Sequence, residues 1–365
     1  MPLLEGWGSY TSLSPSKLKT AGKIKVFFTL SGEHPTLPAA EVKALLEAEE
    51  VEVKEFEARR FLARMLISQD DCSRILDRAS MVTGCYHELL ACQAEVEEIA
   101  KEVGGVDWST LKGKSFAVRV ERKGGCCPHL RSAELERLIG KVVKTQVPEA
   151  RVCLKAPEVL VKGLVVYQSF YLGLSLAEVR RGVFDERRPR RRPFFHPSAL
   201  EPKLARLFVN LARAKRGDLL FDPFAGTGSI LMEAALIGCS PVGLDIDLRM
   251  VEGTKANLRR YAPHAIGALR GDARHPPILK VDCVVTDPPY GRTSSTRGED
   301  TSTLIENFLN VAADLLPHGR YMCLATPSWL DLAEAALKAG FKVVEEHEIR
   351  VHRSLTRRVT VFRRC

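Results

Sequence analysis

The 365-residue sequence lacks the features that mark several common classes of protein. No apolar run approaches the roughly 18–20 residues that a membrane-spanning helix needs, and residues 1–20 lack the charged and then apolar order of a signal peptide. None of the 10 cysteines belongs to a Cys-x-x-Cys pair, so the sequence indicates no zinc site and we expect no metal. These absences predict a soluble, cytoplasmic protein with no membrane partner.

Side-chain amides are also scarce, with 4 asparagines and 4 glutamines, whereas Glu, Lys and Arg abound. This composition is typical of proteins from thermophiles. Apolar residues make up 45% of the chain, which is ample for globular cores. The length indicates two or three domains.

Acidic residues are too few to balance the basic ones, and the formal net charge is +9. Most of the excess lies in residues 176–216, where 12 Lys or Arg stand against 4 Asp or Glu. We expect residues 176–200 to form a basic linker. Its centre, residues 187–193, is called the basic segment and contains Arg187, Arg188, Arg190, Arg191 and Arg192. Prolines would keep it extended and its arginines could neutralise phosphates, although a solvated charge run is the alternative.

The first half of the chain shows two successive α+β patterns. Residues 1–22 have no clear period, and we expect a disordered extension there. Residues 23–95 follow the order β-α-β-β-α-β, which is typical of a ferredoxin-like domain. The expected strands cover residues 24–30, 51–57, 61–68 and 81–90, with helices over the apolar positions 42–46 and after residues 70–71.

Residues 96–175 form the second pattern, with helices expected at 96–103 and 133–144 and strands at 116–119, 151–155, 159–162 and 164–172. The basic loop, residues 121–131, is rich in glycine and precedes a helix N-terminus. Glycines allow close backbone approach, and a helix start favours phosphate. Arg122, Lys123 and Arg131 are therefore candidate RNA contacts, and a plain basic surface loop is an equally good interpretation.

Residues 201–365 alternate strands and helices, which predicts a Rossmann-like, doubly wound and mainly parallel sheet. The two last strands are too close in sequence for a crossover helix, so they should pair antiparallel. The seven expected strands cover residues 218–222, 241–245, 268–270, 281–286, 321–325, 343–349 and 358–362. The expected helices cover residues 201–214, 229–237, 249–261, 304–315 and 330–337.

Four carboxylates follow four consecutive expected strands of this region: Asp222, Asp245, Asp272 and Asp287. In an open α/β sheet, ligands bind beyond the carboxyl ends of the strands, so we expect all four acids to line one crevice. Each acid alone could be a helix cap. That explanation is poor for four successive strand ends.

The first of these strands runs into the glycine loop, residues 222–228, where glycines let backbone approach a ligand at a helix N-terminus. The spacing is neither G-x-G-x-x-G nor that of a P-loop, so pyrophosphate is disfavoured and Asp222 suits an ammonium group. Asp245 follows 23 residues later, where ribose hydroxyls are held in such folds. Asp272 and the Ala273 N–H could read an adenine edge.

The fourth strand runs into Asp287-Pro288-Pro289-Tyr290, which we call the Asp-Pro-Pro-Tyr motif. Prolines bring no N–H of their own, so the Pro288 carbonyl is free of helical bonding. A carboxylate, a carbonyl and a flat ring at one strand end suit an amino group on a planar base. A proline-stiffened turn with a capping Asp is the alternative for the motif taken alone.

Together these strand ends resemble the class I S-adenosylmethionine-dependent methyltransferases, and the Asp-Pro-Pro-Tyr motif is similar to the D/N-P-P-Y/F motif of amino-methyltransferases. The upstream half resembles a THUMP module with its ferredoxin-like companion, most clearly in residues 116–120 and 132–137. With residues 192–197 bridging the halves, the whole order resembles the archaeal tRNA guanosine-10 N2-methyltransferases.

The resemblance implies an enzyme that binds tRNA and S-adenosylmethionine and converts guanosine 10 to mono- and dimethylguanosine. We expect it to be a monomer. It implies a catalytic set consisting of Asp287, Pro288, Pro289 and Tyr290. The implied cofactor-binding set is His196, Pro197, Asp222, Phe224, Gly226, Thr227, Gly228, Asp245, Ile246, Asp272, Ala273 and Asp287. Three alternatives stay open: guanosine elsewhere in tRNA or in rRNA, adenine N6 in DNA, and a non-catalytic RNA-binding protein.

Overall fold

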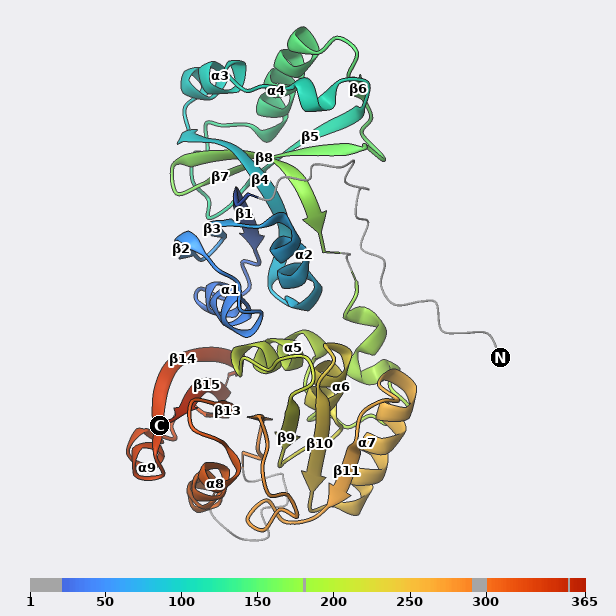
Figure 1. The fold of residues 1–365 in the computed structure, drawn as a ribbon, viewed down its shortest axis with the longest axis vertical. Coiled ribbons are helices and arrows are strands. Elements are labelled where there is room, and N and C mark those ends of the chain that lie inside the picture. Colours follow the sequence, from blue (N-terminus) through green and yellow to red (C-terminus); the bar gives the residue numbers. More distant parts are fainter. Residues whose placement is uncertain (1–21, 180–181, 291–300, 354) are drawn as a thin grey trace, which may run out of the picture. The chain divides into compact units, whose positions relative to one another are not determined.

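The computed structural model describes residues 22–179, 182–290, 301–353 and 355–365. The expected N-terminal extension, apart from residue 22, and Gly291 after the Asp-Pro-Pro-Tyr motif lie outside these described residues. The chain divides into two units (Figure 1). The second unit contains residues 182–365 and two short earlier segments, 43–50 and 78–81, and the remaining residues up to 181 form the first unit.

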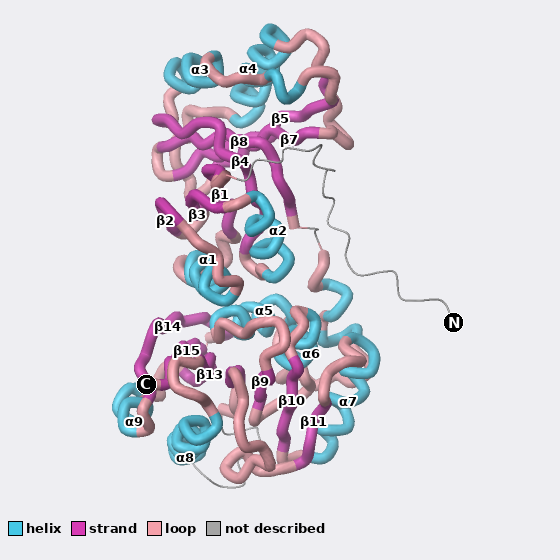
Figure 2. Tube along the Cα trace, viewed as in Figure 1, coloured by secondary structure: helices cyan, strands magenta, loops and turns pink. Residues whose placement is uncertain are grey.

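The first unit is built on one sheet with the strand order β2-β3-β1-β4-β8-β7-β5-β6 (Figure 2). Its strands are β1 (Ile24–Leu30), β2 (Lys54–Arg59), β3 (Leu62–Ile67), β4 (Val82–Gln93), β5 (Ser115–Arg122), β6 (Arg151–Val152), β7 (Val159–Val166) and β8 (Ser169–Glu178). The 12-residue strand β4 pairs antiparallel with β1 on one side and with β8 on the other. The two α+β patterns expected from the sequence therefore share one continuous sheet.

The helices of the first unit are α1 (Leu37–Ala48), whose last turns belong to the second unit, α2 (Gln69–Arg78), α3 (Val96–Gly104) and α4 (Ser132–Gln146), with a 3-10 turn at Ser109–Leu111. In α4, the buried residues Leu135, Ile139 and Val143 recur every four positions, so one face packs on the core beside Trp108 and Phe116. Within the described residues, no helix combines the length and apolar character required to cross a membrane.

The second unit contains a seven-stranded sheet with the order β11-β10-β9-β12-β13-β15-β14 (Figure 1). Its strands are β9 (Leu219–Asp222), β10 (Ser240–Asp245), β11 (Gly267–Arg270), β12 (Cys283–Thr286), β13 (Tyr321–Pro327), β14 (Phe341–His352) and β15 (Leu355–Arg364). The five strands from β11 to β13 are parallel, and β15 runs antiparallel to both β13 and β14. The Rossmann-like α/β fold and the antiparallel last pair are confirmed.

The strand order reverses between β9 and β12, because β10 and β11 follow β9 on one side while β12 and β13 lie on the other. In open α/β sheets the crevice at such a switch point binds the ligand. Asp222 ends β9, and Asp287 comes directly after β12. The topology thus brings the first and fourth acids of the sequence analysis to the two borders of this crevice.

Helices cover both faces of this sheet. They are α5 (Pro202–Leu211), α6 (Ser229–Leu236), α7 (Leu248–Tyr261), α8 (Thr301–Leu315) and α9 (Ala333–Lys338), preceded by 3-10 turns at Asp185–Arg187 and Pro189–Arg191. In β10, Val242 and Leu244 belong to the core that contains α8, whereas a side chain at Gly243 would meet Leu231 of α6. Because successive residues of a strand point to opposite faces, α6 and α8 lie on opposite sides.

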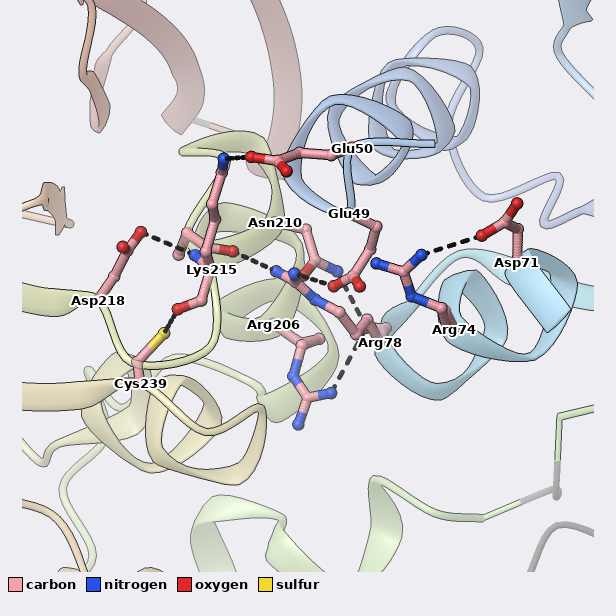
Figure 3. Close-up of polar contacts among 11 residues, drawn as sticks. Glu49, Glu50, Asp71, Arg74, Arg78, Arg206, Asn210, Lys215, Asp218 and Cys239 are labelled. Atoms are coloured by element: carbon pink, nitrogen blue, oxygen red, sulfur yellow. Dashed lines mark hydrogen bonds and ion pairs between the residues drawn. The ribbon is translucent and has the colours of Figure 1, made fainter. Parts of the chain in front are cut away.

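A cluster of hydrogen bonds around Arg78 holds the turn that follows α5 in the second unit (Figure 3). The buried Arg78 guanidinium donates to the Glu49 carboxylate at 2.6 Å and to the Ala214 carbonyl at 2.6 Å. The side-chain amide of Asn210 donates to the Arg78 carbonyl at 3.0 Å. A buried carbonyl without a donor is costly, and Arg78 supplies that donor together with a charge for Glu49.

We expect Arg78→Ala to lower the unfolding free energy of the second unit by about 3 kcal/mol, because Ala214 loses this donor and Glu49 loses this cation. Calorimetry would record the lower melting temperature. Arg74→Ala is the matched control, since the Arg74 side chain, one turn earlier in α2, is 47% exposed and pairs with Asp71 at 2.9 Å (Figure 3). Exposed pairs contribute little. Equal losses in both variants would contradict the prediction.

Candidate active site

Asp222 links the two strands that border the switch point. Its carboxylate is buried, and Oδ1 accepts hydrogen bonds from the Thr286 hydroxyl at 2.7 Å and from the Phe224 N–H at 3.2 Å. Burial raises the pKa of Asp222 to about 7 despite these bonds, and the nearby carboxylates of Asp245 and Asp287 raise it further. Three of the four expected acids therefore lie close enough to interact electrostatically.

The Asp222→Asn substitution should stabilise the second unit, and more so at higher pH. The ordinary pKa of 3.8 applies to the unfolded chain and the folded pKa is about 7, so ionisation of the buried group destabilises the fold as pH rises between these values. Asparagine keeps an acceptor but no charge. By calorimetry, we expect an unfolding free energy about 2–4 kcal/mol above wild type near pH 8 and a smaller gain near pH 5. A gain that is constant across pH would refute this explanation.

At two positions of the glycine loop, the backbone adopts a conformation that only glycine reaches easily. Gly226 has φ of 52° and Gly228 has φ of 77°, both in the left-handed region. A Cβ at Gly228 would lie 2.7 Å from the Thr254 side chain of α7. The Thr254 hydroxyl donates to the Gly226 carbonyl at 2.7 Å. The loop is thus fastened to α7, directly before α6 begins.

Asp245 contacts the same loop from the end of β10. Its Oδ2 accepts a hydrogen bond from the Gly226 N–H at 2.9 Å, and its Oδ1 accepts one from the Asp247 N–H at 2.9 Å. Burial raises the pKa of Asp245, and these backbone donors oppose the rise. Each carboxylate oxygen has a second lone pair. Asp245 can therefore hold the loop and still accept a hydroxyl, with the half-buried Ile246 beside it.

Asp272 lies just beyond β11 and is already paired with a cation. The Arg274 guanidinium contacts both of its oxygens, with Nη2 at 2.6 Å from Oδ2. These hydrogen bonds lower the pKa of Asp272 to about 2, so it is ionised at any physiological pH. Ala273, which lies between Asp272 and Arg274 in the sequence, is buried. The strand end is joined to its neighbour, because the Gly271 N–H donates to the Asp245 carbonyl at 3.0 Å.

A buried asparagine attaches the end of the linker region to the glycine loop. The Asn257 side chain accepts from the Phe194 N–H at 2.9 Å and donates to the carbonyls of Phe194 at 3.1 Å and Thr227 at 2.9 Å. His196, whose Nδ1 lies 2.7 Å from the Ser198 hydroxyl, follows two residues later. His196 is half-buried and Pro197 is exposed.

The Asp-Pro-Pro-Tyr motif is held by an arginine from another strand. Arg357 of β15 places Nη2 2.9 Å from Oδ2 of Asp287 and donates from Nε to the Tyr290 hydroxyl at 2.8 Å. The Tyr290 hydroxyl donates to Oδ1 of Asp287. Burial raises the pKa of Asp287, and the Arg357 charge opposes this rise. Pro288 is buried and Pro289 half-buried.

Two arginines of the basic segment are structural. Arg192 is buried and donates to the Ser229 hydroxyl at 2.6 Å and to the Arg187 and Leu200 carbonyls. Burial lowers its pKa to about 10. The Arg187 side chain is 14% exposed and pairs with the buried Glu233 at 2.8 Å. Contrary to the expectation from the sequence, neither can reach an RNA phosphate while it holds these partners.

The other expected RNA contacts lie at or near the surface. Arg188, Arg190 and Arg191 are exposed, and Arg188 pairs with Asp185 at 2.7 Å.

In the first unit, Arg122 is exposed and its guanidinium donates to the Cys127 carbonyl at 3.3 Å. The half-buried Lys123 pairs with Glu121 at 2.9 Å. The Arg131 side chain is 78% exposed. The basic loop therefore presents cations whose bonds are local and easily exchanged for phosphate.

Sequence patterns did not single out five residues that shape the site: Thr254, Asn257, Arg274, Thr286 and Arg357. The sequence carried no signal for Asn257, since two of the 4 asparagines, Asn307 and Asn310, are exposed. Arg357 could have been found from the antiparallel last strand. A strand that runs against its neighbours begins at their carboxyl edge, so its first residues face the crevice.

Each unit matches a known domain family. Residues 93–175 match the THUMP domain family, and residues 189–359 match UPF0020, the RMKL-like methyltransferase domain family. The first match lies in the first unit and the second match in the second unit.

Similar proteins span most of the chain. The chain is 38% identical over 344 residues to the tRNA (guanine(10)-N2)-dimethyltransferase of Methanothermobacter thermautotrophicus, which covers 93% of this chain and 100% of that relative. It is 33% identical over 312 residues to the tRNA (guanine(6)-N2)-methyltransferase of Thermus thermophilus, with 78% of each covered. The crystal structure of TrmN from Thermus thermophilus aligns with a TM-score of 0.56 at 24% identity, over 93% of this chain and 100% of that one.

Proposed function

We propose a function from the premise that this chain belongs to the family of tRNA (guanine(10)-N2)-dimethyltransferases, with a THUMP domain and an RMKL-like methyltransferase domain. It transfers methyl groups from S-adenosylmethionine to the exocyclic N2 of guanosine 10 in tRNA, forming mono- and dimethylguanosine. The observation that carries the proposal is the position of the Asp-Pro-Pro-Tyr motif at the switch point, beside Asp222 and the glycine loop.

The second unit offers groups that fit S-adenosylmethionine. The buried Asp222, with a pKa raised to about 7, gains from a cation beside it, which suits the ammonium group of the cofactor. The space beside the Gly226 Cα is open, because a Cβ there would lie 3.9 Å from the nearest heavy atom, the Phe224 carbonyl oxygen. A ligand can therefore approach the backbone at Gly226. Asp245 and Asp272 add acceptors at the next two strand ends.

We assign the cofactor-binding residues by the part of the molecule that each would hold. The glycine loop, including Asp222, Phe224, Gly226, Thr227 and Gly228, would hold the methionine part. Asp245 and Ile246 would hold the ribose, Asp272 and Ala273 the adenine, and His196 with Pro197 would close the pocket. When bound, the cofactor supplies a methyl group made electrophilic by its sulfonium.

Asp287 acts on the nucleophile. The exocyclic amine of guanine is conjugated with the ring, so its lone pair is a poor nucleophile. Hydrogen bonds from the amine to the Asp287 carboxylate and the Pro288 carbonyl favour a more pyramidal nitrogen and stabilise the positive charge that develops on it. No strong base is required, because the nitrogen becomes acidic once methylated and Asp287 is the nearest acceptor for its proton.

Tyr290 orients the base, since its ring offers a surface on which guanine stacks. Stacking aligns the amine with the methyl group, so Tyr290 contributes to the rate by orienting the reactants and not by taking part in the reaction. A paired guanosine must first leave its stack, at a cost of a few kcal/mol. The exposed arginines of the basic segment and the basic loop bind phosphates of the tRNA and hold it during this step.

The proposal is tested with the full-length protein, labelled S-adenosylmethionine and three tRNA transcripts. One transcript is unchanged, one carries adenosine in place of guanosine 10, and one carries adenosine in place of a guanosine at position 6. We expect methyl incorporation into the first and third and loss of incorporation into the second. Nuclease digestion and mass spectrometry of the product would show mono- and dimethylguanosine.

Two outcomes would reject this assignment. Incorporation that survives loss of guanosine 10 and disappears with loss of guanosine 6 would place the target at the position named for the Thermus thermophilus relative. The absence of incorporation from all three transcripts, with tRNA binding intact, would favour a non-catalytic RNA-binding protein.

A further inference from the structure

Arg357 is the charged side chain that ties the parts of the Asp-Pro-Pro-Tyr motif together. We propose that Arg357 is a positioning residue that fixes Asp287 and Tyr290 in the orientation that receives the guanine base. This inference rests on the proposed function and deepens it, because it adds a residue from β15 to a site otherwise built at the ends of parallel strands. Arg357 does not itself contact the reacting atoms.

The guanidinium uses two different nitrogens for two different partners. Nη2 lies 2.9 Å from Oδ2 of Asp287, and Nε donates to the Tyr290 hydroxyl at 2.8 Å. Its central carbon also lies 5.6 Å from the centroid of the Tyr290 ring. A guanidinium is planar and rigid, so both contacts are set at once by the position of one side chain.

The arrangement leaves one oxygen of Asp287, Oδ1, without a contact to Arg357, so that it can accept from the substrate amine. Arg357 holds Oδ2 of Asp287, whereas Oδ1 accepts from the Tyr290 hydroxyl. A carboxylate oxygen has two lone pairs, so Oδ1 can also accept a hydrogen bond from an amine. Because the hydroxyl of Tyr290 is engaged on both sides, its ring cannot swing freely. The stacking surface is therefore prepared before the base arrives, which reduces the entropy lost on binding.

Electrostatics supports the same role. Asp287 is largely buried, which disfavours its charged form and raises its pKa, and its charge in turn raises the pKa of Asp222 at the end of β9. The thiol of Cys323 on β13 and the phenol of Tyr290 also face Asp287, and burial raises the pKa of both. Arg357 supplies the positive charge that lowers the pKa of Asp287. An ionised Asp287 accepts hydrogen bonds from an amine, whereas a protonated one carries a hydroxyl that donates instead.

The place of Arg357 in the sheet explains how it reaches the motif. It stands opposite Pro327 of β13 and Ile349 of β14. Pro327 ends β13, which is the parallel neighbour of β12. The early part of β15 therefore lies at the carboxyl edge of the parallel strands. The side chain of Arg357 is 12% exposed there. The adjacent Arg358 pairs instead with Glu348 at 3.4 Å, which makes it a matched control on the same strand.

Three variants of the full-length protein test the proposal with labelled S-adenosylmethionine and tRNA. Arg357→Gln should lose roughly 100-fold in kcat/KM, as expected for a misplaced reacting group, with an unchanged dissociation constant for S-adenosylhomocysteine by calorimetry. The acid limb of its pH–rate profile should move to higher pH, because Asp287 loses the cation that lowers its pKa. Arg357→Lys should recover part of the activity, and Arg358→Gln should behave as wild type.

A measurement without substrate gives a second readout. Without Arg357, the pKa of the buried Asp287 rises further above its unfolded value, so ionisation destabilises the fold more as pH increases. The melting temperature of Arg357→Gln should therefore fall further below wild type as the pH rises above the ordinary pKa of Asp287. The double variant Arg357→Gln, Asp287→Asn should lose this pH-dependent deficit, because asparagine carries no charge.

The outcomes separate this inference from the proposed function. If wild type transfers methyl groups and Arg357→Gln matches Arg358→Gln in rate and pH profile, the positioning role is overturned while the function stands. A large loss of rate with no change in either pH dependence would also overturn it, because a purely structural role predicts that result. If wild type itself transfers no methyl group, the proposed function fails, and the melting curves alone still report on the Arg357–Asp287 pair.

Discussion

Asp287→Ala is expected to lower kcat for methyl transfer by roughly 1,000-fold or more, while the dissociation constant for S-adenosylhomocysteine changes little. The substitution removes the carboxylate that accepts from the guanine amine and stabilises its developing charge. It leaves Asp222 and the glycine loop in place, because their hydrogen bonds go to Thr286 and Asp245 and not to Asp287. Single-turnover rates with labelled cofactor measure the first effect, and calorimetry measures the second.

Two further variants make the interpretation specific. Asp287→Asn keeps the shape of the side chain without its charge, so a loss close to that of alanine would assign the effect to the charge. Asp282→Asn is the matched control, because Asp282 precedes the same strand at its opposite end and binds the Leu219 N–H at 2.9 Å and Arg320 at 2.7 Å. Near-wild-type turnover by Asp287→Ala would exclude this motif as the catalytic site.

Glu233→Ala is expected to destabilise the second unit by about 3–5 kcal/mol, the usual cost of removing one partner from a buried ion pair. The Glu233 side chain is 1% exposed and pairs with Arg187 at 2.8 Å and with Arg206 at 2.9 Å. Both arginine side chains are largely buried, so both would lose a compensating carboxylate. Glu233 belongs to α6, which starts directly after the glycine loop. We therefore expect weaker binding of S-adenosylhomocysteine as well.

Calorimetric melting of Glu233→Ala beside Glu252→Ala provides the comparison. Glu252 also forms an ion pair within the second unit, with Lys255 at 3.0 Å, but its side chain is 58% exposed. Exposed pairs contribute little to stability, so the control should melt within about 1 °C of wild type. A melting temperature for Glu233→Ala equal to that of the control would show that the buried network does not stabilise the unit.

The order of helices and strands was largely predictable, because it depends on short apolar periods along the chain. The seven strands of the second unit occur in the predicted order, and the antiparallel last pair followed from its short connection. The single sheet of the first unit was not predicted. Strand β4 extends to Gln93 and pairs with β8, whose residues lie more than 70 positions later. The choice of such a partner depends on packing between distant segments.

The acids of the site were predictable for the same local reason. Asp222, Asp245, Asp272 and Asp287 follow apolar strands directly, and the carboxyl ends of parallel strands meet along one edge of a sheet. Their partners were harder to predict, because these lie at very different distances along the chain. Arg274 holds Asp272 from two positions away, and the same kind of residue, Arg357, reaches Asp287 from 70 positions away.

In the basic segment, the sequence does not reveal which arginines are buried and which are exposed. Its five arginines look alike as a run of charge, and the sequence by itself determined that this part of the chain is strongly basic. Tertiary structure alone decided that Arg187 and Arg192 are structural while three others are exposed. The physical reason is that burial of a charge requires a partner. Glu233 and Ser229 lie about 40 residues further along and become neighbours only when α6 packs against the segment.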